Sequence, residues 1–413
     1  TITASGATTF CQGGSVTLTA NSGTGYSYQW SNNTNNQVMT ATTAGSYTVT
    51  VTDANGCSVT SAPTVVTVNA LPTTAAITGT NSVCIGGTTL LSTTATNPVW
   101  SSANTAVATV AANGLVTGVS AGTVVVSYTI TNANGCTNTA SVTVTVNQLP
   151  TAAIATVGAT TFCQGGSVTL LASNAPAGMT YTYQWRLNGT AITGATSNTY
   201  VANASGNYSV TITTNSGCAA TSAATTVTVN PLPVLAANTG SASVCENGTV
   251  TLANAQAGGL WSTANNTIAT INAVTGLVTG VNPGTTTLTY TFTNANGCTN
   301  SVSTNFTVNA LPAAVITANG STTFCQGGSV VLTANAGSTY LWSNGQTTQS
   351  ITVSNTADIT VTVTNANGCS ATSAITSVVV NALPVANITS LNGNSFCQGG
   401  SVTLNATGAA SYI

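Results

Sequence analysis

The 413-residue sequence predicts an all-β protein, a linear array of β-sandwich modules. Three observations support this prediction. The same landmarks recur along the chain, apolar residues alternate with threonine and serine at the period of a strand, and Asn-Gly pairs stand between the alternating stretches. No stretch has helical spacing with helix caps. A chain of this length is also too long for one ordinary core, so several domains are expected.

Asn-x-Leu-Pro strings divide the chain. They begin at Asn69, Asn147, Asn230, Asn309 and Asn381. One tryptophan falls in each interval, and we expect each to be a core residue: Trp30, Trp100, Trp185, Trp261 and Trp342. The predicted modules therefore span residues 1–70, 71–148, 149–231, 232–310 and 311–382. Residues 383–413 are the start of a further, truncated module.

Module one illustrates the predicted order of elements. Its opening string, TFCQGGSV at residues 9–16, places a Phe-Cys pair before a Gly-Gly pair that we expect to turn into the strand SVTL. A strand with Trp30 follows. In the next stretch, SYTVTVT, Tyr47, Val49 and Val51 alternate with threonine, which puts apolar side chains on one face and hydroxyls on the other. β-Branched residues favour strands, and strands at this spacing make a β-sandwich.

A hairpin turn precedes the last strand of each module. NANGC occupies residues 132–136, 294–298 and 365–369, and DANGC begins at Asp53. We predict a two-residue Asn-Gly turn, in which both positions take positive φ. Asp53 is expected to form an Asx turn there, and a Ca²⁺ site would need several carboxylates per ion.

Two types of module alternate. Modules one, three, five and the partial sixth (first type) open with Phe-Cys-Gln-Gly-Gly. Modules two and four (second type) carry the strings VWSSANTAVATV and LWSTANNTIATI, each followed by GLVTGV. The second type resembles the bacterial immunoglobulin-like group 2 domain, whose pattern of Trp-Ser-Ser-x-Asn, Val-Ala-Thr-Val and Gly-x-Val-Thr-Gly-Val is matched over residues 100–123 and 261–285.

The first type is similar to the immunoglobulin-like and PKD-like modules of large secreted Bacteroidetes surface proteins, with residues 183–213 as the closest stretch. Together the two resemblances cover essentially the whole chain. They imply immunoglobulin-like sandwiches in an extracellular tandem array of the adhesin or gliding-filament kind. In classical immunoglobulin domains a disulfide joins the two sheets beneath the tryptophan. The matching positions near Leu18 and Val49 are apolar, so we expect purely hydrophobic packing under Trp30.

The charge content excludes several classes of function. Arg186, Asp53, Glu246 and Asp358 are the only charged side chains, and the chain has no His and no Lys. Nothing could neutralise a row of phosphates, so no nucleic acid partner is expected. No apolar run is long enough to span a bilayer, so no membrane insertion is expected in this segment. The first ten residues lack the regions of a signal peptide and an initiator Met, and we expect a window from a longer chain.

Catalysis and metal binding are not expected. A catalytic thiol at Cys11 would need a base or a positive environment, and the chain has no His or Lys to supply it. The cysteines occur singly, without a second metal ligand nearby. Asp53, Glu246 and Asp358 fall in three different modules, so no carboxylates pair, and Arg186 is expected to be a solvated strand residue. We therefore predict no enzyme, no cofactor and no metal site.

The eleven cysteines indicate structural disulfides in an oxidising, extracellular setting. Each complete module has an opening cysteine before its Gly turn and a hairpin cysteine after Asn-Gly or Ser-Gly. Two pairing schemes are possible, one within modules and one across the linkers, and each leaves one of the eleven cysteines unpaired. Geometry favours bonds within modules, because each hairpin cysteine starts a strand of about 12 residues, roughly 40 Å, that leads away to the linker. The predicted pairs are Cys11–Cys57, Cys84–Cys136, Cys163–Cys218, Cys245–Cys298 and Cys325–Cys369, with Cys397 unpaired.

The predicted function is mechanical. Leu-Pro linkers restrict the backbone between sandwiches, which favours a semi-stiff stalk of a long, secreted cell-surface adhesin or filament that holds a distal binding region away from the cell. The expected partners are neighbouring modules of the same chain. An alternative is a self-assembling extracellular fibre, because edge strands without Lys and a net charge of −2 permit lateral contact with other copies. A carbohydrate-binding array is a third hypothesis, and it would need clustered, exposed aromatic side chains.

Overall fold

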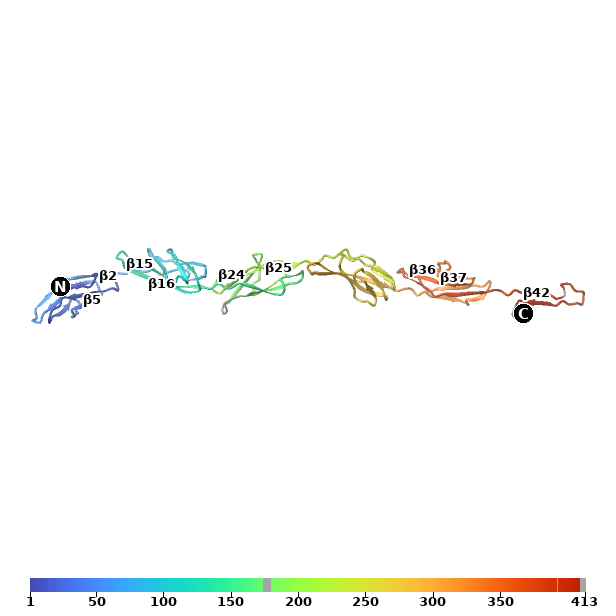
Figure 1. Cartoon of the computed structure of the whole chain (residues 1–413), viewed down its shortest axis with the longest axis horizontal. Helices are drawn as coiled ribbons and strands as arrows, with labels where there is room; N and C mark the ends of the chain where they lie inside the picture. The colour runs from blue at the N-terminus through green and yellow to red at the C-terminus, as the bar shows by residue number, and fades with distance from the viewer. Residues whose placement is uncertain (174–179, 392, 409–413) are drawn as a thin grey trace. The chain divides into compact units, whose positions relative to one another are not determined.

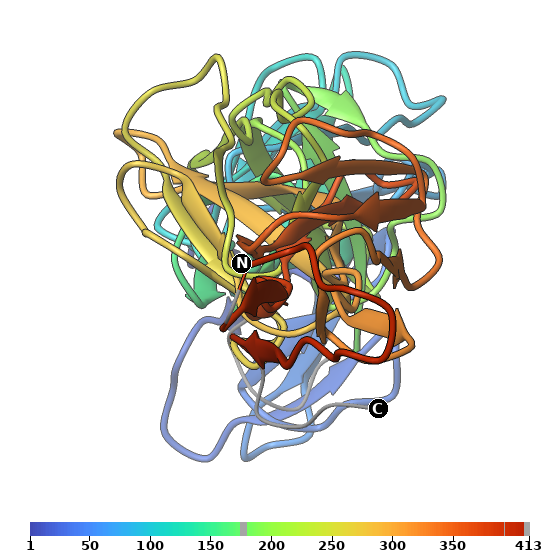
Figure 2. The ribbon, with the colours of Figure 1, turned by 90° about the vertical axis from the view of Figure 1, so that its right-hand side faces the viewer.

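Every regular element of the described chain is a β-strand. The structure, a computed structural model, describes residues 1–173, 180–391 and 393–408 (Figures 1 and 2). No helix in these ranges is long and apolar enough to cross a membrane. The chain forms two compact units, Thr1–Val229 and Asn230–Ile413, which are described separately. The prediction of an all-β fold is confirmed.

Five hydrophobic cores follow one another along the chain. They lie within residues 2–68, 77–146, 152–229, 244–308 and 314–378. Each core lies inside one of the modules that the sequence predicts, and the module boundaries themselves stay a prediction.

The first core lies between one sheet on one side and two sheets on the other. One sheet has the order β1 (Ile2–Ala4), β3 (Val16–Ala20), β5 (Val38–Ala41). The other side is made of β2 (Thr9–Cys11), β9 (Thr64–Asn69), β6 (Gly45–Tyr47) and of β4 (Ser27–Trp30), β7 (Val49–Thr52), β8 (Ser58–Thr60). Leu18 and Val49 are fully buried and Trp30 is 1% exposed. The packing beneath Trp30 is hydrophobic, as the sequence predicted.

The second core lies between a four-stranded and a three-stranded sheet. Its larger sheet has the order β10 (Ser82–Cys84), β16 (Thr137–Asn147), β15 (Gly122–Thr131), β12 (Val99–Ser102). The smaller sheet has the order β11 (Thr88–Leu90), β14 (Leu115–Gly118), β13 (Ala108–Val110). Trp100 is only partly buried and its ring centroid lies 5.3 Å from that of the fully buried Tyr128.

The third core completes the first unit. One sheet has the order β17 (Ala153–Val157), β19 (Val168–Ser173), β22 (Thr199–Ala202). The other has the order β18 (Thr161–Cys163), β25 (Thr225–Asn230), β23 (Gly206–Thr214), β20 (Tyr181–Leu187), β21 (Thr190–Ala191), and β24 (Ala219–Thr221) pairs with β23. Burial raises the pKa of Tyr208, whose hydroxyl donates to the Ala204 carbonyl at 3.0 Å. Tyr47 makes the same bond to Thr43 in the first core, at 2.9 Å.

The second unit repeats both arrangements. Its second-type sheets are β26 (Ser243–Cys245), β32 (Thr299–Asn309), β31 (Gly284–Thr293), β28 (Leu260–Thr263) and β27 (Thr249–Thr251), β30 (Leu277–Gly280), β29 (Ala269–Ile271). Its first-type sheets are β33 (Ile316–Asn319), β35 (Val330–Ala334), β37 (Ser350–Val353), then β34 (Thr323–Cys325), β41 (Thr376–Asn381), β38 (Ala357–Ile359), and β36 (Thr339–Trp342), β39 (Val361–Thr364), β40 (Ser370–Thr372).

The predicted sixth module, residues 383–413, contains two described strands. β42 (Asn387–Ser390) pairs antiparallel with β43 (Leu404–Thr407). Residues 409–413, the end of this predicted segment, lie outside the described residues.

The hairpin turn differs from the predicted two-residue form. Between β15 and β16, Gly135 has a φ of 77°, whereas Asn134 is not among the described residues with positive φ. The Asn132 amide donates to the Cys136 carbonyl and the Gly135 amide to the Asn132 carbonyl, both at 3.0 Å. This is the longer loop in which one Gly takes the left-handed conformation after an ordinary turn. The side-chain oxygen of Asn132 caps this loop.

Candidate functional site: the joint between modules

The opening cysteine of a module lies beside the linker that leaves the module. The short strand that carries it runs parallel to the last strand, so Cys11 is opposite Asn69. Cys84 is opposite Asn147, and in the second unit Cys245 is opposite Asn309 and Cys325 opposite Asn381. In each case the partner is the Asn of the Asn-x-Leu-Pro string. The register therefore brings every one of these cysteines to the exit of its module.

The Gly turn after the opening cysteine keeps it at this place. Gly13 has a φ of 95°, and the Gly14 amide donates to the Cys11 carbonyl at 2.9 Å. These features fit a tight turn that needs a left-handed third residue. In module four, Asn247 takes that position with a φ of 60°. The Gln12 amide also donates to the Asn69 carbonyl at 2.9 Å, which ties the turn to the linker.

The hairpin cysteine lies at the other end of a module, where the preceding linker arrives. In module two the Asn132 side-chain oxygen accepts bonds from the amides of Asn134 at 3.1 Å and Cys136 at 3.0 Å. Asp53 does the same for Asn55 and Cys57, both at 2.9 Å, so its predicted Asx turn is confirmed.

Disulfides connect the exit of one module to the arrival end of the next. Cys11 bonds to Cys136, with 5.6 Å between the Cα atoms, and Cys84 bonds to Cys218, with 5.7 Å. Cys245 bonds to Cys369 in the second unit, with 5.6 Å. Each bond therefore joins an opening cysteine to the hairpin cysteine of the following module. Cys163 and Cys298 are also disulfide-bonded.

The predicted disulfides within modules are wrong. Cys11–Cys57, Cys84–Cys136, Cys163–Cys218, Cys245–Cys298 and Cys325–Cys369 are all contradicted, because Cys11, Cys84 and Cys245 bond elsewhere and take Cys136, Cys218 and Cys369 as partners. Direct bonds between the cysteines on either side of a linker, such as Cys57–Cys84, are contradicted in the same way.

The strand order explains the error. In second-type modules the hairpin cysteine does start a long strand that leads to the linker, and β16 has 11 residues. In first-type modules this stretch is divided into two short strands, such as β8 and β9. At about 3.3 Å per residue β16 separates the two ends of the module by roughly 36 Å. The parallel pairing of β10 with β16 puts Cys84 at the far end, beyond the reach of Cys136.

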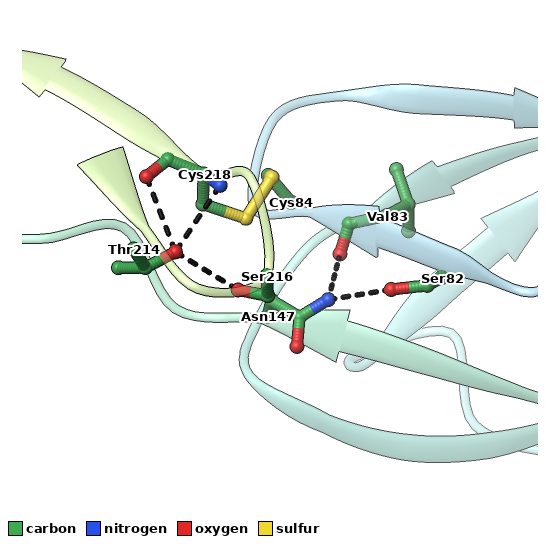
Figure 3. The surroundings of a disulfide bond; sticks show 7 residues. All are labelled: Ser82, Val83, Cys84, Asn147, Thr214, Ser216 and Cys218. Atoms are coloured by element: carbon green, nitrogen blue, oxygen red, sulfur yellow. Dashed lines mark hydrogen bonds between the residues drawn. A yellow bond between two sulfur atoms is a disulfide. The ribbon is translucent and has the colours of Figure 1, made fainter. Parts of the chain in front are cut away.

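Side chains around the Cys84–Cys218 bond hold both of its ends (Figure 3). On the exit side, the Asn147 amide donates to the Ser82 hydroxyl at 2.7 Å. On the arrival side, Thr214 replaces the capping Asn, and the Cys218 amide donates to its hydroxyl at 3.1 Å. The Thr214 and Ser216 hydroxyls lie 2.9 Å apart. The bond therefore joins two loops that are each fixed by hydrogen bonds.

The arrival end also binds the linker through hydrogen bonds from asparagine side-chain amides to backbone carbonyl groups. Having capped its own turn with its oxygen, Asn132 donates its side-chain amide to the Ala70 carbonyl at 2.8 Å. Asn365 donates in the same way to Ala310 at 2.9 Å, and Asn294 to Pro231 at 3.1 Å. One side chain thus serves both its own hairpin and the preceding linker.

Second-type modules add a further linker contact. Asn138, two residues after the hairpin cysteine, donates to the Pro72 carbonyl at 2.9 Å, and Asn300 donates to Pro233 at 2.9 Å. First-type modules have Val59, Ala220 or Ala371 at this position, which cannot donate.

Burial distinguishes bonded hairpin cysteines from the one that is free. Cys136, Cys218 and Cys369 are 1% exposed and Cys298 is fully buried. Cys57 is an exposed free thiol, and so are the opening cysteines Cys325 and Cys397. Cys397 was predicted to be unpaired, whereas Cys57 and Cys325 were not.

The predicted core residues and charged residues do not form a chemical site. Trp30, Trp185 and Trp342 are at most 1% exposed, Trp261 is 6% exposed and Trp100 is half-buried. Arg186 lies on β20, where its Nε donates to the Thr211 hydroxyl at 3.1 Å. Asp358 accepts a bond from the Ser377 hydroxyl at 2.6 Å, and Glu246 lies in a Gly turn of another module. Among the described residues, no three His, Cys, Asp or Glu side chains gather where a metal could bind.

Sequence reasoning missed the asparagines that hold the linker. The sequence predicts a hairpin turn at Asn132, Asn294 and Asn365, and it assigns no role to Asn138 and Asn300. The available signal was the repeated Asn at the first position of the turn, where Asp or Thr would cap equally well. An amide is needed there only if a second acceptor is near.

Residues 150–231 match the family model described as "Ig-like domain CHU_C associated". This segment is similar to that family of Ig-like domains. The Ig-like domain contains Trp185 and the Tyr208 bond to the backbone, the features that characterise the core of the immunoglobulin sandwich. The described chain is an all-β array of tandem Ig-like modules.

Solved structures of other Ig-domain arrays resemble the chain of Ig-like modules. The Sidekick-1 immunoglobulin domains 1–5 are 13% identical, with 90% of this chain and 97% of that chain covered and a TM-score of 0.22. The bacterial integrin-binding protein invasin is 16% identical, with coverage of 74% and 78% and a TM-score of 0.28. A Ca²⁺-stabilised, ice-binding adhesin of an Antarctic bacterium is 16% identical, with coverage of 90% and 96% and a TM-score of 0.28. No curated protein matches the chain in sequence.

Proposed function

We propose that this chain is a non-enzymatic stalk segment of a long, extracellular, repetitive cell-surface adhesin or filament. The stalk holds a distal binding region away from the cell, and its joints limit bending between neighbouring modules. The observation that carries the proposal is the disulfide that joins an opening cysteine to the hairpin cysteine of the following module, as in Cys11–Cys136, Cys84–Cys218 and Cys245–Cys369. Such bonds persist in an oxidising compartment, which supports an extracellular location.

The hydrogen bonds at the joints add to this proposal. A flexible linker would leave its carbonyl groups to water, whereas here Asn132 and Asn138 bind Ala70 and Pro72 of the preceding linker. A covalent bond and fixed hydrogen bonds at one place constrain the angle between two modules more than a proline linker alone.

Electron microscopy of the purified chain tests the stalk. Under oxidising conditions we expect isolated, thin, beaded rods, and after reduction we expect bent chains with a wide spread of angles between modules. Oxidised chains that bend as freely as reduced ones would contradict the proposal.

A self-assembling fibre is the second candidate. It is favoured by the scarcity of charge, since Arg186 is the only basic side chain available to guard the edges of the sheets. Ordered filaments of several chains in the same micrographs would support the fibre and count against the simple stalk. A carbohydrate-binding array has less support, because Trp30, Trp185 and Trp342 are buried and offer no aromatic platform.

A further inference from the structure

We propose that each second-type module binds one unit of a neutral sugar polymer, in a pocket beside the indole N–H of Trp100 or Trp261. The inference concerns modules two and four alone, because the tryptophans of the first-type modules are buried and hydrogen-bonded within their own modules. It goes beyond the proposed stalk, which does not depend on it.

The tryptophans of the two module types differ in how their indole N–H groups are paired. In first-type modules the indole donates to a backbone carbonyl of the following loop, at 2.8 Å for Trp30, 2.9 Å for Trp185 and 2.8 Å for Trp342. Among the described residues, no acceptor pairs with the indole N–H of Trp100 or Trp261. No side-chain nitrogen or oxygen in this part of the chain is both buried and unpaired, so both N–H groups reach solvent. Each of them is a free donor that a ligand can use.

An open pocket lies at each of these two tryptophans. In module two it has a volume of about 210 Å³, and Trp100 and Asn113 are among its lining residues. In module four it has a volume of about 250 Å³, and Trp261 and Thr275 are among its lining residues. Both pockets lie between the loop before the tryptophan strand, β12 or β28, and the turn before β14 or β30. The same site therefore recurs in both second-type modules.

A glycine brings the nitrogen edge of each indole to this turn. A Cβ on Gly276 would lie 2.9 Å from Nε1 of Trp261. A Cβ on Gly114 would lie 3.3 Å from Cε2 of Trp100, the ring carbon that is bonded to Nε1. Both glycines have positive φ, 69° and 84°. The N–H edge of each indole therefore lies beside a turn that lines the pocket.

Hydrogen bonds hold the two walls of each pocket together. The Leu91 amide donates to the Gly114 carbonyl at 3.0 Å, and the Leu252 amide donates to the Gly276 carbonyl at 2.9 Å. Both leucines line their pockets and are almost fully buried. Because the walls are fixed before a ligand arrives, binding costs little conformational entropy.

The lining indicates the chemical class of the ligand. None of the four charged side chains of the chain lines either pocket, so a charged ligand would lose water without gaining a partner. The indole ring and the leucine offer apolar surface, and the indole N–H, the Ser92 hydroxyl and the Thr275 hydroxyl offer hydrogen bonds. A neutral hexose has an apolar C–H face and hydroxyl oxygens that accept from an N–H. Pockets of this size admit one such ring rather than an oligosaccharide.

Two copies of the site in one chain favour a polymer of such units over a free sugar. A small open pocket binds one sugar ring weakly, because few contacts have to offset the freedom that the ring loses. A polymer presents the same unit many times, so its second contact with the chain forms at a high effective concentration. The repetition of second-type modules therefore suits a neutral polysaccharide.

Nuclear magnetic resonance of the full chain, labelled with ¹⁵N at tryptophan, tests the proposal. The five indole N–H signals should divide into three that exchange slowly with water and two that exchange fast, those of Trp100 and Trp261. A Trp100→Phe variant assigns the fast pair. We expect glucose, galactose or mannose to shift the two fast signals and not the three slow ones, with glycerol at the same concentration as the control for polyols. The soluble polymer of the hexose that binds should bind at least about tenfold more tightly than the hexose itself.

A variant that fills one pocket provides the matched comparison. Ala112 is exposed and lines the pocket of module two, so Ala112→Leu should abolish the sugar-induced shift at Trp100 and leave that at Trp261. Ala121→Leu, at an exposed position outside the pocket, should leave both shifts unchanged.

Three results would overturn the inference. The first is that none of the three hexoses shifts the fast signals, or that glycerol shifts them equally. The second is that Ala112→Leu leaves the shift at Trp100 unchanged. The third is a shift with an uncharged peptide such as triglycine and with none of the hexoses, which would assign the pocket to a peptide. A polymer that binds no more tightly than its hexose would contradict the polymeric ligand.

Discussion

At the scale of residues, one asparagine links turn formation to the joint. Asn365 accepts from the Asn367 and Cys369 amides at 3.0 Å and donates to the Ala310 carbonyl at 2.9 Å. Asp53 keeps the first function and lacks a donor for the second. The surface hydroxyls act locally in a similar way, since Thr50 and Thr60 pair across two strands at 2.9 Å. Side-chain hydrogen bonds replace the charges that this surface lacks.

Replacing Asn365 by Asp should loosen one joint without unfolding its turn. The variant retains the cap and loses the bond to Ala310, a loss of about 0.5–1.5 kcal/mol. The Cys245–Cys369 bond should therefore be reduced by a dithiol roughly two- to tenfold faster, as followed by mass spectrometry. Cys11–Cys136 and Cys84–Cys218 in the same molecule are the controls. An unchanged rate at Cys245–Cys369 would show that the amide does not hold the joint.

The tryptophans should differ in their contribution to stability. Trp185 is fully buried and its indole donates to the Ser197 carbonyl at 2.9 Å, whereas Trp100 is half-buried. Trp185→Ala should cost about 3–5 kcal/mol and open module three, and Trp100→Ala should cost clearly less in module two. Hydrogen exchange, resolved by module, measures both. Equal losses of protection would contradict the difference in burial.

At the scale of elements, the sequence was sufficient for strands and insufficient for their order. Alternation around Tyr47, Val49 and Val51 identifies a buried face, because only strands repeat every two residues. No feature of the TFCQGG string itself indicates that its short strand pairs in parallel with the last strand of the module. That pairing is a contact between distant segments, and it decides which end of the module carries the opening cysteine.

The sequence predicts the turn after Cys11 correctly and the hairpin turn at Asn132 incorrectly, and the two outcomes have a related cause. The tight turn after Cys11 is determined by its own residues, because only Gly takes the φ of 95° found at Gly13 without strain. The hairpin at Asn132 depends on a side-chain cap and a contact with the linker, which Asn-Gly alone does not reveal. Local conformation was predictable, and contacts with a neighbouring module were not.

Replacing Gly118 by Ala should displace the opening strand of module two. A Cβ at this position would lie 2.7 Å from the Cys84 carbonyl oxygen and 2.9 Å from a methyl group of Val146. Gly280→Ala produces the same conflict with the Cys245 carbonyl oxygen, at 2.8 Å. We expect each to destabilise its module by about 1–3 kcal/mol in urea unfolding. Gly6→Ala meets nothing within 4 Å and is the matched control. A Gly118→Ala protein as stable as this control would contradict the close packing.

At the scale of the whole molecule, the disulfides overlap along the sequence. Cys84 lies between Cys11 and Cys136, and Cys136 lies between Cys84 and Cys218. A break in the linker at residues 70–72 would therefore leave the two parts joined by Cys11–Cys136. At each such joint, tension is carried both by the backbone of the linker and by the disulfide, which is favourable for a segment under tension.

Pulling single molecules should show the consequence. The Cys245–Cys369 bond closes 124 residues, and this length of chain holds roughly 400 Å of extension at about 3.3–3.6 Å per residue. We expect the fully reduced chain to release several hundred ångström more length than the oxidised chain before it is taut. Equal lengths in the two states would contradict overlapping closures.

Disulfide mapping tests the central claim most directly. The oxidised full chain, digested without reduction at a pH that prevents exchange, should yield peptides that link Cys11 to Cys136, Cys84 to Cys218 and Cys245 to Cys369. Peptides that link Cys11 to Cys57, or Cys84 to Cys136, would place the bonds within modules and contradict the joint.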